Sequence, residues 1–315
     1  MKKLLIFCIL VSVCLLFLSC GKNETPEKEN KNKTEAGFVF EEKENGIYIT
    51  GYEGEDMSPV IPSDIGGKTV VGIGKSAFES LKLKHVKLPD TLKVIEEFAF
   101  RKCFVLESVK IPDSCTEIRD GAFNFCSELS SAELGSCIEK LGNNVFAVTQ
   151  IKEITIPDSC TSVGDFCFYD CGSLESVIIG QNVKSLGESC FSECVKLVDI
   201  DFTGKTETLG QYCFANCLSL KKIVLPEEIT EYGVGLFFGC GFSRFEVGEN
   251  VKHISEDAFG SCKALTDVYL PDTVEKIEKT AFSDINMSSL TIHCSADSTG
   301  EIFADYNGYK VSYEQ

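Results

Sequence analysis

Residues 106–129 read LESVKIPDSCTEIRDGAFNFCSEL, and this stretch decides the fold because close variants of it recur along the chain. Val109 and Ile111 alternate with polar residues, which is typical of a strand with one buried face. The proline-aspartate pair that follows predicts a turn at the end of that strand. The segment before Phe123 is short and contains small residues, which suits a helical turn or a tight irregular arc.

The phenylalanine of this stretch marks a regular period. Phe recurs at steps of 22 or 23 residues, at Phe78, Phe100, Phe123, Phe146, Phe168, Phe191, Phe214, Phe237, Phe259 and Phe282. A period held over ten copies predicts a repeat solenoid of about ten turns, with short parallel strands, one per turn, in a curved stack. Each 22-residue step lacks one residue in the arc after Phe, where a loss is tolerated because the arc lies outside the strand.

Three phrases carry a resemblance to a known family. They are LPDTLKVIEEFAFRKC at 88–103, IPDSCTEIRDGAFNFC at 111–126 and LPDTVEKIEKTAF at 270–282. They resemble the BspA-type leucine-rich repeats of bacterial surface proteins, over about residues 60–294. The resemblance implies a leucine-rich repeat stack over 67–294, a β-rich cap over 37–66 and a closing cap over 295–315. Members of the family are mostly secreted or surface-anchored, and several are associated with adhesion to host or extracellular-matrix proteins and to other bacteria.

The start of the chain has the three parts of a secretory signal. Lys2 and Lys3 are followed by an apolar run over 4–18, which ends before Cys20. The run is short for a transmembrane anchor, the alternative interpretation. Residues 16–20 resemble the bacterial lipobox, with Phe17 at the position where the lipobox prefers Leu. The resemblance implies that 1–19 is a signal peptide, that Cys20 is lipidated, and that the exported protein is held at the outer membrane or cell surface.

Residues 21–36 read GKNETPEKENKNKTEA and have almost no apolar side chains. Such a segment cannot offset the entropy cost of folding, so it is expected to be a disordered tether after Cys20.

Charge and motif content exclude several functions. The net charge is −18, from 30 Lys+Arg and 48 Asp+Glu, which argues against nucleic acid as a partner. The same balance argues against electrostatic docking onto anionic lipid, so membrane contact is expected through the N-terminal lipid only. The chain has three His and lacks zinc-protease, nucleophile-elbow and P-loop motifs. We therefore expect no enzyme activity and no cofactor.

Cysteine is frequent, with 17 residues in the chain, of which 14 follow Cys20. Seven of these stand three residues after a repeat Phe, and others share their positions in the repeat with Leu, Val or Ala. This usage favours free, buried thiols that serve as small apolar residues. Disulfides between stacked turns remain an alternative in an exported protein. The C-x-x-x-C spacing speaks against a structural metal.

The outward positions of the strands predict a binding face, because each turn presents one variable side chain there at fixed spacing. The row between the two core positions contains the apolar residues Ile178, Val224 and Tyr269, followed by Thr291. These three are candidate anchors for a protein partner, although β-propensity alone is the alternative reason for apolar residues there. Two residues earlier in their turns, Lys222 and Arg244 interrupt an otherwise acidic surface and could pair with acidic groups of a ligand.

Taken together, the sequence predicts a lipid-anchored surface protein that binds macromolecules through its repeats, in adhesion to host or matrix proteins or to other cells. The alternative is a structural or scaffold protein of the envelope or periplasm without a host ligand. A third class, a thiol- or metal-dependent enzyme, has little support in the motifs.

Overall fold

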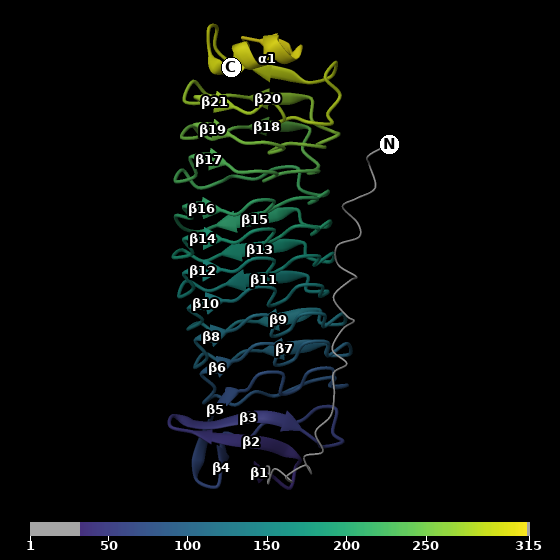
Figure 1. Ribbon diagram of the computed structural model, residues 1–315, viewed down its shortest axis with the longest axis vertical. Helices are drawn as coiled ribbons and strands as arrows, with labels where there is room; N and C mark the ends of the chain where they lie inside the picture. The colour runs from purple at the N-terminus through teal and green to yellow at the C-terminus, as the bar shows by residue number, and fades with distance from the viewer. Residues whose placement is uncertain (1–31, 314–315) are drawn as a thin grey trace, which may run out of the picture. The chain divides into compact units, whose positions relative to one another are not determined.

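The computed structural model describes residues 32–313, which lie within one compact unit, Asn32–Gln315. Figure 1 shows a stack of similar turns, each with two strand positions joined by bends. The stack is a β-solenoid of about 12 turns, which confirms the predicted repeat solenoid. The count exceeds ten because strands of the N-terminal hairpin and a C-terminal strand extend the stack beyond the Phe-containing turns.

The first column of strands coincides with the predicted ones. In β7, Val109 is buried between the exposed Ser108 and Lys110, as the alternation requires. Within the column, paired neighbours run parallel, for example Val177 beside Ile200. The members are β7 (Ser108–Lys110), β9 (Ser131–Glu133), β11 (Glu153–Ile156), β13 (Ser176–Ile179), β15 (Asp199–Phe202), β18 (Arg244–Glu246), β20 (Asp267–Tyr269), β22 (Thr291–His293) and β23 (Lys310–Ser312).

Each turn also carries a second strand, so the expectation of one strand per turn was wrong. The second strands are two residues long, and most of them bury one apolar side chain, such as Ile118. They are too short to show an alternation that the sequence could reveal. They are β6 (Val94–Ile95), β8 (Glu117–Ile118), β10 (Lys140–Leu141), β12 (Ser162–Val163), β14 (Ser185–Leu186), β16 (Thr208–Leu209), β17 (Glu231–Tyr232), β19 (His253–Ile254) and β21 (Lys276–Ile277).

The repeat Phe lies at the middle of a tight arc. Phe98 and Lys102, two residues on either side of Phe100, adopt φ values of 58° and 59°, in the left-handed region. This kink lets the arc donate hydrogen bonds to the next turn, for example from the Phe100 N–H to the Ala122 carbonyl at 2.7 Å. The Phe rings stack in the core. From Phe78 to Phe214, consecutive ring centroids lie 4.9–5.9 Å apart with interplanar angles of 16° or less.

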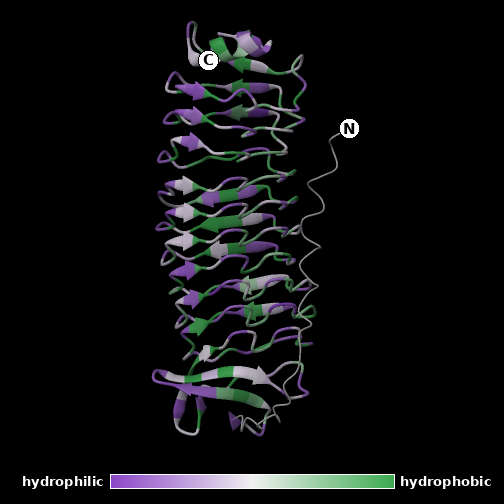
Figure 2. Ribbon diagram, in the orientation of Figure 1, coloured by the Kyte–Doolittle hydropathy of each residue, from purple (hydrophilic) through white to green (hydrophobic). Residues whose placement is uncertain are grey.

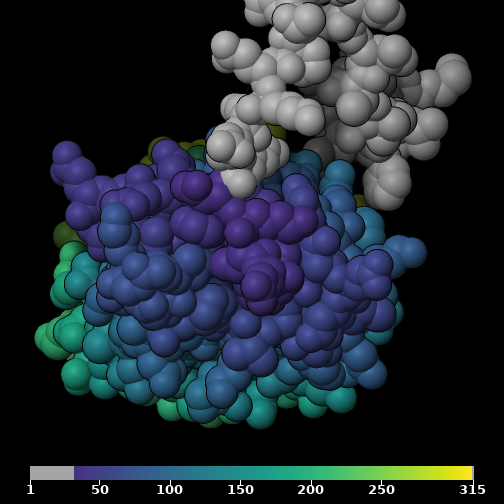
Figure 3. Space-filling view, turned by 90° about the horizontal axis from the view of Figure 1, so that it is seen from below, coloured from purple at the N-terminus to yellow at the C-terminus, as the bar shows by residue number. Residues whose placement is uncertain are grey.

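The N-terminal end is covered by an antiparallel hairpin of β2 (Phe38–Lys43) and β3 (Gly46–Tyr52). β3 continues the second column through β5 (Lys68–Ile73), to which β4 (Asp64–Ile65) also pairs. Figure 3 views this end of the unit. The ring of Tyr52 lies 6.0 Å from Phe78 and closes the Phe stack. β1 (Asn32–Lys33) pairs with β2, so the described end of the segment expected to be a tether is ordered, whereas residues 21–31 lie outside the described residues.

The C-terminal end is closed by α1 (Thr299–Asn307), the helix of the described region. Ser298 accepts a hydrogen bond from the Glu301 N–H and Gly308 ends the helix at φ 78°. Phe303 of this helix lies 5.7 Å from Phe282, ring centroid to ring centroid, so α1 covers the other end of the Phe stack. No described helix is long and apolar enough to span a bilayer.

The cysteines three residues after Phe have a specific contact. The thiol of Cys126 donates to the Phe100 carbonyl at 3.2 Å, and Cys194 does the same to the Phe168 carbonyl at 3.2 Å. Cys fits this position because it is small and apolar yet provides a weak donor to a buried carbonyl of the preceding turn. All 14 described cysteines are free, and Cys137 alone among them is exposed.

This arrangement predicts the thiol chemistry of the protein. Burial raises the pKa of Cys171 to about 11 and that of Cys262 to about 12, so both stay protonated at neutral pH. We expect one described thiol, that of Cys137, to react quickly with a thiol reagent at pH 8, and the other 13 to react after denaturation. Titration under non-reducing conditions measures this. Fewer thiols in the denatured protein would mean that turns are joined by disulfides.

Candidate protein-binding face and the cleft that interrupts it

The candidate face is the outward side of the first column. Ile178 lies in β13 beside Thr155 of β11 and Asp201 of β15, and 42% of its surface is exposed. Val224, in the same outward row, is 69% exposed. Figure 2 shows that the strands of the first column contain both hydrophilic and hydrophobic residues. Both residues therefore present apolar surface to solvent on a face that is otherwise polar.

Tyr269 is held differently, because both of its ring faces are occupied. The Arg244 guanidinium, one turn earlier, lies 4.0 Å from the ring centroid, and the His293 ring, one turn later, stacks on it at 4.1 Å. His293 also hydrogen-bonds Asp267 through Nε2 at 2.8 Å, and this bond is the main reason that the pKa of Asp267 is lowered. Tyr269 is half-buried and offers its edge and hydroxyl, not an open ring face, to a partner.

The neighbour of Tyr269 differs from the expected one. Tyr269 pairs with His293, and Thr291 lies beside Asp267, so the expected row is displaced by two residues in the last turn. The cause is a local turn before β22, in which the Asn286 side chain accepts hydrogen bonds from the backbone and hydroxyl of Ser288. The residues in this turn lengthen the arc after Phe282, and the sequence period gave no sign of it.

The first column is interrupted between β15 and β18. The backbone of residues 221–225 makes no backbone hydrogen bond with any described residue, and Figure 1 shows no arrow in that turn of the first column. The second column is also interrupted, between β16 and β17. The arc remains joined, because the Phe214 N–H donates to the Leu236 carbonyl at 3.0 Å. The turns therefore separate at the strands while they stay in contact at the Phe stack.

The next arc remains closely packed on this turn. A Cβ atom on Gly241 would lie 2.0 Å from the Leu218 carbonyl oxygen, so only glycine allows this approach. Because the turns are in contact at the arc and separated at the strands, a wedge-shaped opening lies between them.

Large aromatic residues explain the separation. Tyr232 takes the core position that Ile254 occupies in the next turn, and Phe245 takes that of Val268. Tyr232 and Phe242 make edge-to-face contacts with Phe237, at centroid distances of 5.6 Å and 5.4 Å. The Phe245 ring lies tilted against Phe237 at 5.1 Å. These rings need more room than Ile or Val, and overfilling a packed core forces the backbone to shift.

Short arcs after Phe also contribute to the separation of neighbouring strands. The steps from Phe146 to Phe168 and from Phe237 to Phe259 are both 22 residues. The strands that follow Phe146 and Phe237, β11 and β18, both lack a hydrogen-bonded partner strand on the preceding turn. The expectation that the arc absorbs a lost residue without affecting the strands was therefore wrong at these two positions, because a shorter arc offsets the strand from its neighbour.

The separation leaves a cleft of about 720 Å³ between residues 221–226 and 243–248. Ile223 and Leu225, which lie on one of its walls, are half-buried, whereas the corresponding residues of β13, Val177 and Ile179, are buried. The opposite wall carries Arg244, Phe245 and Glu246, and Arg244 pairs with Glu246 at 2.8 Å. Lys222 at the rim is exposed and has no ion pair with a described residue.

The structure brings together part of the predicted set. Lys222, Val224 and Arg244 border the cleft, and Tyr269 joins them through its contact with Arg244. Ile178 lies apart, in β13, with β15 between its strand and the cleft. Cys20 lies outside the described residues.

Sequence reasoning missed three residues of this region, His293, Ile223 and Leu225. A signal for the last two existed, because Tyr232 stands at a repeat position that otherwise holds smaller apolar residues.

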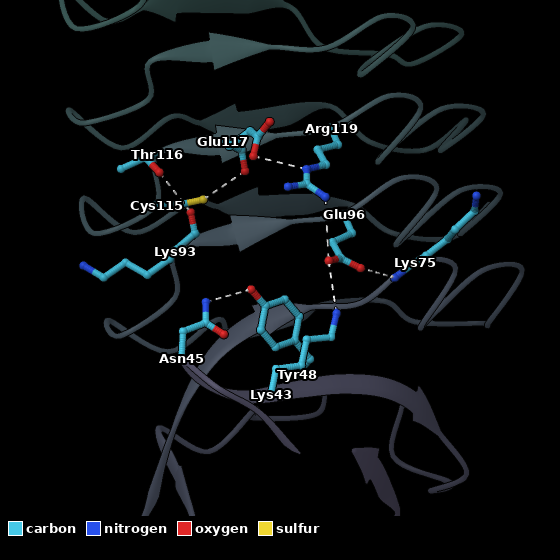
Figure 4. Close-up of polar contacts among 10 residues, drawn as sticks. All are labelled: Lys43, Asn45, Tyr48, Lys75, Lys93, Glu96, Cys115, Thr116, Glu117 and Arg119. Carbon is cyan, nitrogen blue, oxygen red and sulfur yellow. Dashed lines mark hydrogen bonds and ion pairs between the residues drawn. The ribbon is translucent and has the colours of Figure 1, made fainter. Parts of the chain in front are cut away.

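On the outward side of the second column, near the N-terminal cap, charged side chains pair with one another. Glu96 pairs with Lys43 at 3.5 Å and with Arg119 at 3.7 Å, and it accepts a hydrogen bond from the Lys75 N–H at 3.1 Å (Figure 4). Lys43 also lies 3.9 Å from the Tyr48 ring centroid. These contacts tie the hairpin to the first turns, so this face serves the cap.

A metal site and a reactive thiol each place requirements on the titratable side chains of the described region. Among residues 32–313, no group of three or more His, Cys, Asp or Glu is placed to hold a metal ion. The perturbed thiols are buried, and burial raises their pKa values, which makes them poor nucleophiles.

Comparison with known proteins agrees with this architecture. The family described as "BspA type Leucine rich repeat region" matches residues 71–198 and 184–306, with six copies. A leucine-rich repeat protein of T. pallidum is 31% identical, with a TM-score of 0.57 over 60% of this chain and 91% of that chain. A leucine-rich repeat protein of Bacteroides ovatus is 23% identical, with a TM-score of 0.59 over 82% of this chain and 66% of that one. No curated protein matches.

Proposed function

Since the chain belongs to the BspA-type leucine-rich repeat family, we propose that it is a lipid-anchored surface protein that binds protein partners through the outward face of its first strand column. The family match supports a repeat protein with a protein-binding surface. The lipid anchor rests on the lipobox-like residues before Cys20. Adhesion to host or matrix proteins, or to other cells, is the activity that the resemblance to BspA-type proteins favours.

One observation carries the choice of face. The first column exposes the apolar side chains of Ile178 and Val224, and Lys222, two residues before Val224, has no ion pair with a described residue. Interfaces gain most of their energy from a few apolar or aromatic anchors within a polar surround. Tyr269, fixed between Arg244 and His293, is preorganised, so little side-chain entropy is lost when its exposed edge binds.

A capture experiment tests the face. The double variant Ile178→Ser, Val224→Ser should retain partners from extracts of host matrix or neighbouring cells at least about tenfold less well than the native protein, since each lost anchor costs more than about 1 kcal/mol. The matched control is Phe104→Ser, Leu218→Ser, which removes apolar side chains of similar exposure from the arcs. Circular dichroism checks that both variants fold. Equal losses in both variants would place the binding site elsewhere.

Protease treatment of intact cells separates the proposal from a periplasmic scaffold. A surface protein is cleaved by added protease, whereas a periplasmic one is protected until the outer membrane is opened. Full protection in intact cells would favour the scaffold function.

A further inference from the structure

The cleft between residues 221–226 and 243–248 is the one place in the described first column where a strand segment lacks backbone partners on both sides. In the other described turns of this column, each strand segment has backbone partners on at least one side, as buried backbone groups require. Residues 221–225 keep their groups open toward β18, and the near edge of β18 is open as well, because β18 pairs with β20 on its other side alone. Such open edges accept an added strand.

The walls of the cleft define what side chains an added strand would carry. Ile223 and Leu225 point toward the core but remain half-buried, and Val247 and Ile229 complete an apolar floor. A strand alternates its side chains between two faces, so every second residue of the occupant would contact this floor. Those residues must be apolar, because a polar side chain without a partner would be costly there.

The outward residues of the same strand would lie near the rim. Lys222 is exposed there and has no ion pair with a described residue, and the Arg244 guanidinium borders the opposite wall. Acidic outward residues of the occupant complement Lys222, which has no competing partner, whereas Arg244 is already paired with Glu246. The volume of about 720 Å³ is within the range of sites that bind small ligands and short peptides.

We infer that this cleft binds an extended polypeptide segment with alternating apolar and acidic residues, which adds as a strand between residues 221–225 and β18. The inference rests on the proposed protein-binding function and assigns one recognition mode to part of that face. Main-chain hydrogen bonds provide affinity, while the apolar floor and Lys222 provide specificity. The large rings of Tyr232 and Phe245 hold the two turns apart, so the turns do not have to separate when the segment binds.

The test uses the full chain, purified in detergent, and a fluorescent peptide with acetylated N-terminus, the sequence Asp-Val-Asp-Val-Asp-Val and an amidated C-terminus. We expect saturable binding that weakens at least about tenfold when alternate peptide amides are N-methylated, because methylation removes N–H donors of the added strand. Lys222→Glu should weaken binding by about tenfold, a loss of about 1.4 kcal/mol. Lys196→Glu, the same charge change on an exposed arc residue, should leave affinity unchanged.

Hydrogen exchange locates the bound peptide. Amides of residues 221–225 should exchange rapidly in the free protein and slowly with the peptide, while those of β13 stay unchanged. Equal affinity for native and N-methylated peptides, or protection at another site, would overturn the inference. So would a lack of binding at millimolar peptide. If partner capture still depends on Ile178 and Val224 in that case, the proposed function stands and the strand-addition mode alone is rejected.

Discussion

Replacing Phe191 with Ala should lower the free energy of unfolding by about 3–5 kcal/mol, the usual cost of truncating a buried Phe. Phe191 is fully buried, and its ring stacks on Phe168 at 5.2 Å and on Phe214 at 5.9 Å. The truncation removes contacts with both neighbouring turns and leaves a cavity in the middle of the stack. Because each turn of a solenoid is stabilised mainly by its neighbours, the loss weakens two interfaces at once.

Two control variants isolate the effect of the stack. Phe104→Ala removes the same ring from a residue that is 51% exposed, and should change stability by less than about 1 kcal/mol. Lys110→Ala removes an ion pair with Glu133 between two exposed side chains, and should lower stability far less than Phe191→Ala. Urea unfolding followed by circular dichroism measures all three. Similar midpoints for Phe191→Ala and Phe104→Ala would show that the stack is not the source of stability.

Replacing Cys20 with Ala should move the protein from the membrane fraction to the soluble fraction. The proposed lipid is the membrane attachment expected from this sequence, since the net charge of −18 does not favour docking onto anionic lipid. Diacylation is strong enough to anchor a protein, whereas a signal peptide cleaved without lipid leaves no anchor.

Fractionation of cells, with Cys137→Ala as the control, measures the effect of Cys20→Ala. The control also removes one cysteine, but from an exposed position in the repeats. If the Cys20→Ala protein still sediments with membranes, attachment does not depend on this cysteine.

The sequence predicted the fold because one feature is repeated many times. The Phe period, with Val109 and Ile111 as a representative strand pattern, required that similar turns stack and that one side of each strand be buried. The second strand column could not be predicted in this way. A two-residue strand such as Glu117–Ile118 has too few residues for alternation, and it is formed by hydrogen bonds to neighbouring turns, not by a local preference.

The candidate site was predicted in part for the same reason. The outward positions of Ile178, Val224 and Lys222 follow from the period, but contacts between turns depend on register. The local turn at Asn286 displaces the last strand and brings His293 to Tyr269. The cleft results from ring volume, since Tyr232 stands where Ile254 stands one turn later. Periodicity identifies equivalent positions, but it does not indicate how an oversized side chain changes the spacing of turns.

The central claim is that partners bind the outward face of the first column. Photocrosslinking tests it most directly, with a benzophenone amino acid placed at Val224 and, in a second protein, at Lys140, an exposed residue of the second column. Irradiation of each protein in the presence of captured partners is followed by detection of the joined species. The account predicts crosslinks from position 224 and few or none from position 140. Crosslinks from position 140 that equal or exceed those from position 224 would contradict it.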